Sequence, residues 1–313
     1  MKIAMIGAGA MGCLYGALLA KAGEEVWMVG RRPESIEPIK ERGIILTYLD
    51  GSQENVAVKA TTRSADVGQA DLMIFLVMSG DTEAAARESI PMVGPDTYAL
   101  TLQNGIGNAE KMMDVLGMDR VIYGMTLFGG TLKGPGQVAV EAPAGSRIVV
   151  YIGEKKNRPM LFKAAEVLNH AGIRTEVSDD IDQVIWTKLP MACGLGMLTA
   201  ITRLRVGDLV ARDEGKALLR QITDECVEVA EKKGIKLDPE ETFNLLVSTG
   251  TATGEHISSM LGSILSMRKT EIGSLNEAVA NEAEKLGIEA PVNRTVALLV
   301  RILENTYDRR VSS

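Results

Sequence analysis

The first twelve residues, MKIAMIGAGAMG, constrain the fold more than any other stretch of the chain. An apolar run ends at Ile6, a glycine-rich turn follows, and a segment rich in Ala and Leu continues over residues 13–22. This order predicts a strand, a tight turn and a helix. In such units the glycines permit a sharp turn, let a pyrophosphate approach the backbone and let helix and strand pack closely, while N–H groups at the helix start bind phosphate. We therefore expect a Rossmann-type dinucleotide site formed by Gly7, Ala8, Gly9, Ala10, Met11 and Gly12.

Composition narrows the class of protein. The chain has 313 residues, 46% hydrophobic and 24% charged, with a net charge of -7, and this length suits two domains. No basic patch stands out, which argues against a nucleic-acid partner. The N-terminus already reads as a strand and no uninterrupted apolar run is long enough to span a membrane, so we expect no membrane partner and a cytoplasmic location.

The cysteines and histidines give no support to metal or triad chemistry. Cys13, Cys193 and Cys226 are scattered without CxxC spacing, so buried reduced thiols are expected. His170 and His256 are isolated, which gives no support to a zinc site or a Ser-His-Asp triad. We expect no metal.

A second strand, over residues 25–29, is followed by Arg31 and Arg32. In dinucleotide-binding folds an acidic residue near this position binds the ribose 2′-hydroxyl of NAD, whereas arginine suits the 2′-phosphate of NADP. Guanidinium groups bind phosphate bidentately, so NADP(H) is favoured over NAD(H). The alternative is that both arginines are solvated residues before a helix that begins at Pro33.

The pattern continues as α/β to about residue 178. Residues 44–62 read as a polar hairpin that turns at Asp50-Gly51. Buried strands are expected over 72–78 and 98–102, ending beside Met78 and Asn104, and the loops after them should face the same crevice as the glycine turn. Further strands are expected over 121–128, 136–141, 146–152 and 174–177, and a helix over 159–170.

From residue 179 onward the periodicity is helical, over 179–200, 205–233, 239–249, 258–286 and 293–306. We therefore predict an NADP-binding domain over residues 1–178 and a helical substrate and catalytic domain over residues 179–313. The apolar-faced helices after Arg205 leave room for a homodimer.

Five short motifs occur in order along the chain: the glycine turn, Leu102-Gln103-Asn104-Gly105, Trp186-Thr187-Lys188-Leu189, Ser259-Met260, and Arg268-Lys269-Thr270-Glu271-Ile272. With this set the chain resembles, over essentially its whole length, the ketopantoate reductases (2-dehydropantoate 2-reductases) of the 6-phosphogluconate-dehydrogenase-like group. The resemblance implies that NADPH reduces the 2-oxo group of ketopantoate, giving pantoate on the route to coenzyme A.

The resemblance also implies roles for four residues. Lys188 matches the catalytic lysine, Glu271 its acidic partner, Asn104 the asparagine beside the nicotinamide and substrate, and Ser259 the serine on the substrate carboxylate side. The chemistry agrees, because hydride transfer to a carbonyl carbon leaves negative charge on the oxygen, which a cationic donor stabilises and protonates. Taken singly, Lys188 and Glu271 also fit solvent-facing charges on amphipathic helices.

Several positions depart from the family pattern. Met78 stands beside the expected cofactor site where a lysine is common, and Ala192 and Gly196 stand where the substrate-facing helix usually carries asparagines. Ser263 replaces an expected aspartate, and Glu277 an expected glycine. Three hypotheses follow: a ketopantoate-type reductase, the same hydride chemistry on another oxo or imine substrate such as a bulkier or more apolar 2-oxo acid, and a nucleotide-binding sensor without turnover.

Overall fold

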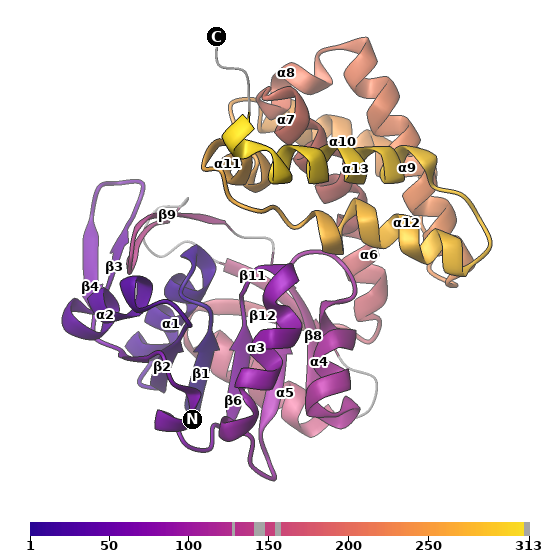
Figure 1. Cartoon of the computed structure of the whole chain (residues 1–313). Coiled ribbons are helices and arrows are strands. Elements are labelled where there is room, and N and C mark those ends of the chain that lie inside the picture. Colours follow the sequence, from indigo (N-terminus) through magenta and orange to yellow (C-terminus); the bar gives the residue numbers. More distant parts are fainter. Residues whose placement is uncertain (127–128, 141–147, 154–157, 310–313) are drawn as a thin grey trace. The chain divides into compact units, whose positions relative to one another are not determined.

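The computed structural model describes residues 1–126, 129–140, 148–153 and 158–309 (Figure 1). Internal contacts divide the chain into two units. The first comprises Met1–Gln103 and Asn108–Ile181, and the second comprises Asn104–Gly107 and Asp182–Ser313. The helical unit therefore includes one short segment from the first half of the sequence, and this segment carries Asn104.

The first unit contains an eight-stranded sheet in the order β12-β11-β8-β7-β6-β1-β2-β5. Neighbouring strands run parallel except for the antiparallel pair β8 and β11. Its strands are β1 (Lys2–Ile6), β2 (Glu25–Val29), β5 (Lys59–Thr61), β6 (Leu72–Phe75), β7 (Tyr98–Thr101), β8 (Val121–Thr126), β11 (Ile148–Gly153) and β12 (Ile173–Val177).

The strand order places a topological switch point beside β1. From β1 the chain first adds β2 on one side and later β6 on the other, so the direction of winding reverses there. Ile6 is in register with Val29 on β2 and with Phe75 on β6, so the three strands end together. Open α/β sheets bind ligands at this position, beyond the carboxyl ends of the strands.

A second sheet of four strands has the order β4-β3-β10-β9. Strands β3 (Ile44–Thr47) and β4 (Gln53–Val56) form the expected antiparallel hairpin, and the Asp50 side chain accepts the backbone N–H of Ser52 in its turn (2.9 Å). Residues 59–61, which were expected to belong to this hairpin, instead form β5 and pair with β2. Strand β9 (Gly130–Gly134), which was not predicted, pairs with β10 (Gln137–Val140).

The helices of the first unit are α1 (Ala10–Lys21), α2 (Pro33–Arg42), α3 (Thr82–Glu88), α4 (Asn108–Leu116) and α5 (Arg158–His170). Helix α1 packs on β2 of the large sheet and on β3, β9 and β10 of the small one, while α5 packs on β11 and β12. The last residues of the strands predicted over 121–128 and 136–141, and the first residues of the strand predicted over 146–152, lie outside the described residues.

The second unit is helical, as expected, but its helices are shorter than the periodicity indicated. They are α6 (Ile181–Met191), α7 (Met197–Thr202), α8 (Val206–Val210), α9 (Asp213–Lys232), α10 (Pro239–Ala252), α11 (Ser259–Leu265), α12 (Asn276–Lys285) and α13 (Pro291–Asn305). A π-helical segment, Ala192–Gly196, separates α6 from α7. Pro190 lies just before it and cannot donate a backbone hydrogen bond, which disrupts the regular α-helical pattern there.

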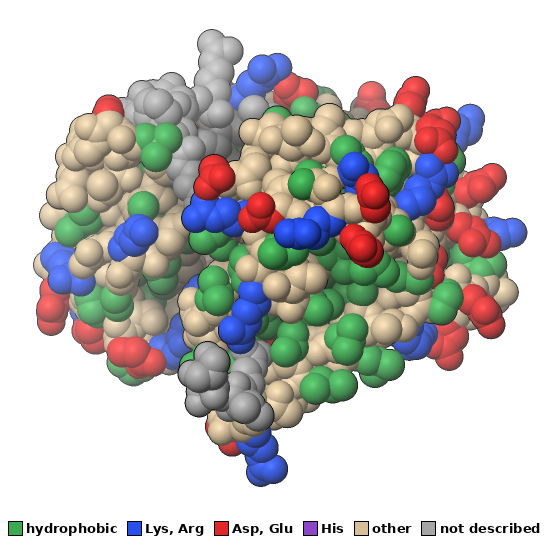
Figure 2. Space-filling model, turned by 90° about the horizontal axis from the view of Figure 1, so that it is seen from above, with side chains coloured by type: hydrophobic (Ala, Val, Ile, Leu, Met, Phe, Trp, Pro, Cys, Tyr) green, Lys and Arg blue, Asp and Glu red, His purple; other side chains and the backbone are tan. Residues whose placement is uncertain are grey.

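Each unit has its own buried apolar core. By length and composition, residues 181–202 could cross a membrane, although Asp182 and Lys188 interrupt their apolar residues; 61% of their most apolar window is buried within the protein, as in a core helix. On the face seen in Figure 2, acidic and basic side chains are intermixed, with hydrophobic side chains between them.

Candidate active site

The glycine turn is fixed by close backbone packing. Gly7 has φ +115°, its N–H donates to Val29 O (2.9 Å), and the N–H of Leu76 donates to Ile6 O (2.9 Å). A Cβ atom on Gly12 would lie 2.0 Å from the Gly7 carbonyl oxygen. Gly7 and Gly12 are therefore required by the turn itself, before any ligand is considered.

Gly9 has a different environment. A Cβ atom placed there would meet no other heavy atom within 4 Å, and Gly9 caps α1 without a side-chain hydrogen bond. The first N–H groups of α1, which include those of Ala10 and Met11, thus have no side-chain cap. Open space beside an uncapped helix N-terminus fits the pyrophosphate of a dinucleotide.

Arg31 and Arg32 are both exposed at the end of β2, and Arg32 immediately precedes α2. Arg31 forms an ion pair with Asp81 (2.6 Å between Nη2 and Oδ1), a neighbour that sequence reasoning missed. The strand predicted over 72–78 ends at Phe75, and Met78, three residues further on, is 39% exposed. Asp81 lies three residues after Met78. The guanidinium group has five N–H donors, so this pairing leaves donors for a phosphate, although the carboxylate competes with it.

The second unit joins three of the predicted site residues by hydrogen bonds. Lys188 Nζ, on α6, donates to Asn104 Oδ1 (2.9 Å), and Asn104 Nδ2 donates to Glu271 Oε2 (2.9 Å). The Glu271 residue is only 8% exposed. The amide of Asn104 therefore lies between the lysine and the carboxylate, and only one orientation of this amide satisfies both bonds.

Burial shifts both ionisable groups towards their neutral forms. Desolvation lowers the pKa of Lys188 to about 8, although the charge of Glu271 opposes this shift. Desolvation likewise raises the pKa of Glu271, while the Asn104 hydrogen bond and the charge of Lys188 act to lower it. A lysine with a pKa near neutrality is a much better proton donor than an ordinary solvated lysine.

The backbone around Asn104 is held firmly. Gly105 has φ +85°, and a Cβ atom there would lie 2.1 Å from Ser274 O. The N–H of Ile106 donates to Ser274 O (2.9 Å), and Ser274 Oγ donates to Asn104 O (3.1 Å). Ser274 ends the 3-10 turn η6 (Ile272–Ser274), which follows Glu271 directly. Asn104 and Glu271 are thus anchored to the same turn.

Ala192 and Gly196 lie four and eight residues after Lys188, at the two ends of the π-helical segment. Ala192 is partly exposed and Gly196 is buried. A Cβ atom on Gly196 would lie 3.4 Å from Met260 Cγ, and Met260 Sδ accepts the backbone N–H of Glu271 (3.5 Å). Gly196, one of the two positions where relatives were expected to carry asparagine, therefore lies close to an apolar thioether side chain that also contacts Glu271.

The serines of the helical unit differ in burial. Ser259, expected on the substrate side, is the first residue of α11 and is exposed. Its neighbour Ser258 is buried, caps α11 by accepting the N–H of Leu261 (3.1 Å), and lies 2.8 Å from Thr199 Oγ1. Ser263 is 8% exposed.

Met260 and Ser274 form hydrogen bonds with Glu271, and Glu304 forms them with its neighbour Thr270; the sequence assigned no role to any of these four residues. Met260 and Thr270 belong to the motifs, whereas Ser274 and Glu304 were missed. A glutamate near the end of a long helix resembles any surface charge, so only its burial, at 7% exposed, reveals it.

Two features define the class of protein: the doubly wound sheet with its open glycine turn, and the hydrogen-bonded Lys-Asn-Glu set of the helical unit. The class is that of two-domain oxidoreductases that use a nicotinamide dinucleotide. The family model described as "Ketopantoate reductase PanE/ApbA" matches residues 3–155, and its "C terminal" counterpart matches residues 180–304. The chain belongs to the ketopantoate reductase family.

Individual relatives agree with this family. The 2-dehydropantoate 2-reductase of Pyrococcus horikoshii is 34% identical over 97% of this chain and 98% of its own length, and that of Halobacterium salinarum is 29% identical over 97% and 99%. The structure of a PanE/ApbA family ketopantoate reductase from Ralstonia eutropha matches with a TM-score of 0.88 and 32% identity, over 99% and 100%. D-mandelate dehydrogenase with NADH and anilino(oxo)acetate matches with a TM-score of 0.92 and 26% identity, over 98% and 100%.

Proposed function

We propose that this protein catalyses the NADPH-dependent reduction of a 2-oxo acid, with the conversion of 2-dehydropantoate to pantoate as the first candidate reaction. The observation that carries the proposal is the hydrogen-bonded set of Lys188, Asn104 and Glu271, in which burial lowers the pKa of the lysine to about 8. The relatives named 2-dehydropantoate 2-reductase support the choice of substrate.

In this proposal, bound NADPH supplies the hydride that adds to the 2-oxo carbon. Lys188 stabilises the negative charge that develops on the oxygen and donates a proton to it from Nζ. Asn104 holds the ammonium group in place through Oδ1, and Glu271 fixes the Asn104 amide and favours the charged form of the lysine. The neutral amine then takes a proton from solvent, which restores the donor.

The first unit would bind the cofactor. The backbone at residues 7–12 would hold the pyrophosphate, Arg31 and Arg32 the 2′-phosphate, and Met78 would lie along the nucleotide. Asn104, which belongs to the helical unit, is also assigned to the cofactor. The open space at Gly9 and the uncapped start of α1 support this assignment. On the substrate side we assign Asn104, Lys188, Ala192, Gly196, Ser259 and Glu271.

A second candidate is the reduction of an apolar or aromatic 2-oxo acid. It is favoured by the apolar surroundings of Gly196, which adjoins Met260 Cγ where an asparagine was expected. The structural neighbour D-mandelate dehydrogenase was solved with anilino(oxo)acetate, an aromatic oxo acid. Loss of hydrogen-bond donors to a charged substrate costs about 1.5–3 kcal/mol each, so these substitutions would weaken binding of a polar substrate.

The deciding experiment is a substrate panel. NADPH oxidation is followed at 340 nm with 2-dehydropantoate, with branched apolar 2-oxo acids and with phenylglyoxylate. We expect saturable activity with at least one of them, and the highest kcat/KM identifies the substrate class. Tight NADPH binding without consumption of any oxo acid or imine would contradict the proposal and favour a nucleotide sensor.

Cofactor choice has its own test. Replacing both Arg31 and Arg32 by alanine should raise KM for NADPH about tenfold, because each exposed guanidinium group loses a charge-assisted contact to the 2′-phosphate. KM for NADH should change little, since NADH lacks that phosphate. Arg63→Ala, which removes another exposed arginine, is the control. An unchanged preference for NADPH in the double variant would show that these arginines do not select the cofactor.

Substitution of the carboxylate that pairs with Arg31 should change KM for NADPH in the opposite direction. Asp81→Asn removes the group that pairs with Arg31 at 2.6 Å. It should lower KM for NADPH and leave KM for NADH unchanged.

We also infer a cytoplasmic location, because Cys13, Cys193 and Cys226 are all free and buried. The exposed apolar side chains of α13, which are Leu298, Leu299 and Ile302, support our proposal of a homodimer.

A further inference from the structure

Glu304, near the end of α13, is a buried carboxylate that the proposed reaction does not use. Its side chain is 1% exposed. One oxygen, Oε1, accepts both the backbone N–H of Thr270 (2.6 Å) and its hydroxyl (2.7 Å). The other oxygen accepts from Arg301 Nη1 (3.2 Å). A buried carboxylate is costly unless such partners satisfy it, so its partners indicate what it does.

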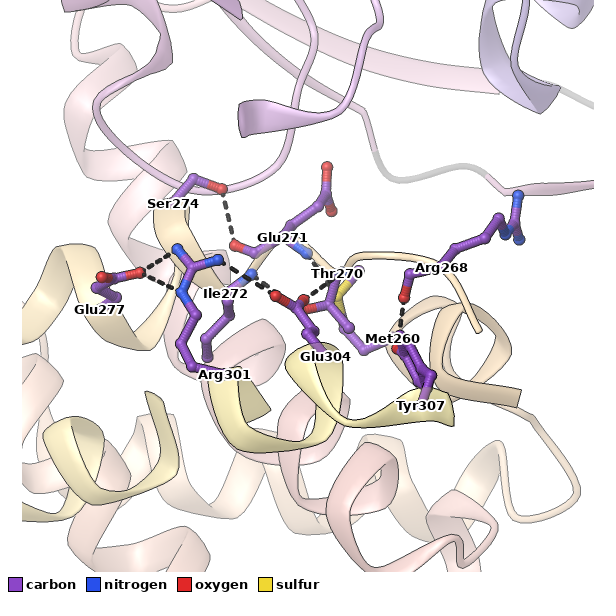
Figure 3. A network of polar contacts seen from close by, with 10 residues as sticks. All are labelled: Met260, Arg268, Thr270, Glu271, Ile272, Ser274, Glu277, Arg301, Glu304 and Tyr307. Atoms are coloured by element: carbon purple, nitrogen blue, oxygen red, sulfur yellow. Dashed lines mark hydrogen bonds and ion pairs between the residues drawn. The ribbon is translucent and has the colours of Figure 1, made fainter. Parts of the chain in front are cut away.

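The residue that Glu304 holds directly precedes Glu271. Thr270 Oγ1 also accepts the backbone N–H of Ile272 (3.2 Å), so the backbone on both sides of Glu271 depends on Thr270. The Glu271 N–H donates to Met260 Sδ (3.5 Å), and its carbonyl accepts from Ser274 N (2.9 Å) and Ser274 Oγ (3.1 Å). Figure 3 shows this network, with the Glu271 carboxylate turned away from Glu304.

We propose that Glu304 is a positioning residue for the reduction. By accepting the hydrogen bonds of Thr270, it fixes the backbone of Glu271. The Glu271 carboxylate is thereby held in its hydrogen bond with Asn104, and its negative charge is held near Lys188. The inference rests on the proposed function for its catalytic consequence. Its structural consequence, a change in the ionisation of Lys188, can be measured without turnover.

The charged groups around this network define the controls. Among the described residues, Arg301 faces Glu304 from the same helix, and Glu277 on α12 pairs with the far side of Arg301. Glu271 is the charged group that acts on Lys188. Glu277→Gln thus removes a charge from the same network without touching Thr270, which makes it a matched control for Glu304.

Glu304→Ala leaves the N–H and hydroxyl of Thr270 without their acceptor. Glu271 should then lose its fixed placement, and we expect kcat to fall about tenfold, because small misplacements of catalytic groups cost one to two orders of magnitude. A displaced Glu271 raises the pKa of Lys188 less, so the alkaline limb of the kcat profile should move to lower pH, by about half a unit. In Glu304→Gln the amide oxygen can still accept both Thr270 hydrogen bonds, so kcat should fall at the same pH as in the parent protein. Glu277→Gln should also leave this pH unchanged.

Two further measurements keep the test decisive. The pKa of Lys188 is measured by NMR from the Cε resonance of 13C-lysine-labelled protein. This resonance is assigned by its absence from the spectrum of Lys188→Met. The pKa of Lys188 should fall in Glu304→Ala even if no substrate of the panel is turned over. If Glu304→Ala does not fold, Thr270→Val, which keeps the N–H but removes the hydroxyl, should shift the Lys188 pKa in the same direction. The proposal would be overturned if the variant that folds has a lower Tm but an unchanged kcat and an unchanged Lys188 pKa. Glu304 would then have a purely structural role.

Discussion

Replacing Lys188 by methionine is expected to lower kcat by about 10²–10⁴-fold, the usual contribution of a positioned proton donor. Methionine has a similar length and is apolar, so it removes the ammonium group without leaving a cavity, and the Tm should be nearly unchanged. The measurement is steady-state NADPH oxidation with the best substrate of the panel. Lys232→Met, which removes an exposed lysine of α9, should match the parent protein.

The Lys188→Arg variant separates charge from proton donation. Arginine keeps the positive charge but does not release its proton near neutral pH. We therefore expect KM to stay close to that of the parent protein while kcat falls nearly as far as in Lys188→Met. Activity that survives both substitutions would exclude Lys188 as the general acid.

The pH dependence follows from the same lysine. In the proposed mechanism reduction requires the protonated form of Lys188, and burial lowers its pKa to about 8, so kcat should be highest below that value and fall as the pH rises through it. The charge of Glu271 raises the pKa of Lys188, so Glu271→Gln should move the fall in kcat to lower pH. A profile that stays flat from pH 6 to pH 10 would contradict this assignment.

The second large effect concerns the glycine turn, where one alanine substitution should lower the stability of the protein and another should lower its affinity for NADPH. In Gly12→Ala the new methyl group would lie 2.0 Å from Gly7 O, so the turn must shift. We expect a loss of about 3 kcal/mol in the free energy of unfolding and a Tm lower by roughly 5–10 °C. Calorimetry of the free protein measures this effect.

Gly9→Ala is the matched variant, because its methyl group would meet no protein atom within 4 Å. Its Tm should stay close to that of the parent protein, whereas its affinity for NADPH should fall at least tenfold, because the methyl group would occupy the space that we propose for the pyrophosphate. Fluorescence titration with NADPH measures the affinity. Equal affinities in Gly9→Ala and the parent protein would show that the dinucleotide does not approach this backbone.

Local patterns in the sequence predicted most of the first unit. The turn at residues 7–12, the strand over 25–29 and the hairpin at Asp50-Gly51 depend on neighbouring residues, whose conformational preferences can be read directly. Strand β9 and the pairing of β5 with β2 were not foreseen, because both depend on partners distant in sequence. The helical segment expected over 179–200 was confirmed, but the π-helical turn within it, which follows Pro190, was not foreseen.

In the candidate site, too, the residues could be named from the sequence but their contacts could not. The motif order identified Lys188, Glu271 and Asn104, but only the tertiary structure joined them by hydrogen bonds, across separations of 84 and 167 residues. It also revealed Asp81 beside Arg31.

By itself, then, the sequence predicted a dinucleotide-binding unit and the change to a helical unit, because these follow from local periodicity and turn chemistry. The residues of the candidate site were implied by the resemblance to the family. Only the tertiary structure showed that burial lowers the pKa of Lys188, that Thr270 donates to Glu304 and that Gly196 lies close to Met260. The physical reason is that desolvation and hydrogen bonding depend on which distant side chains surround a group, and no local pattern records those neighbours.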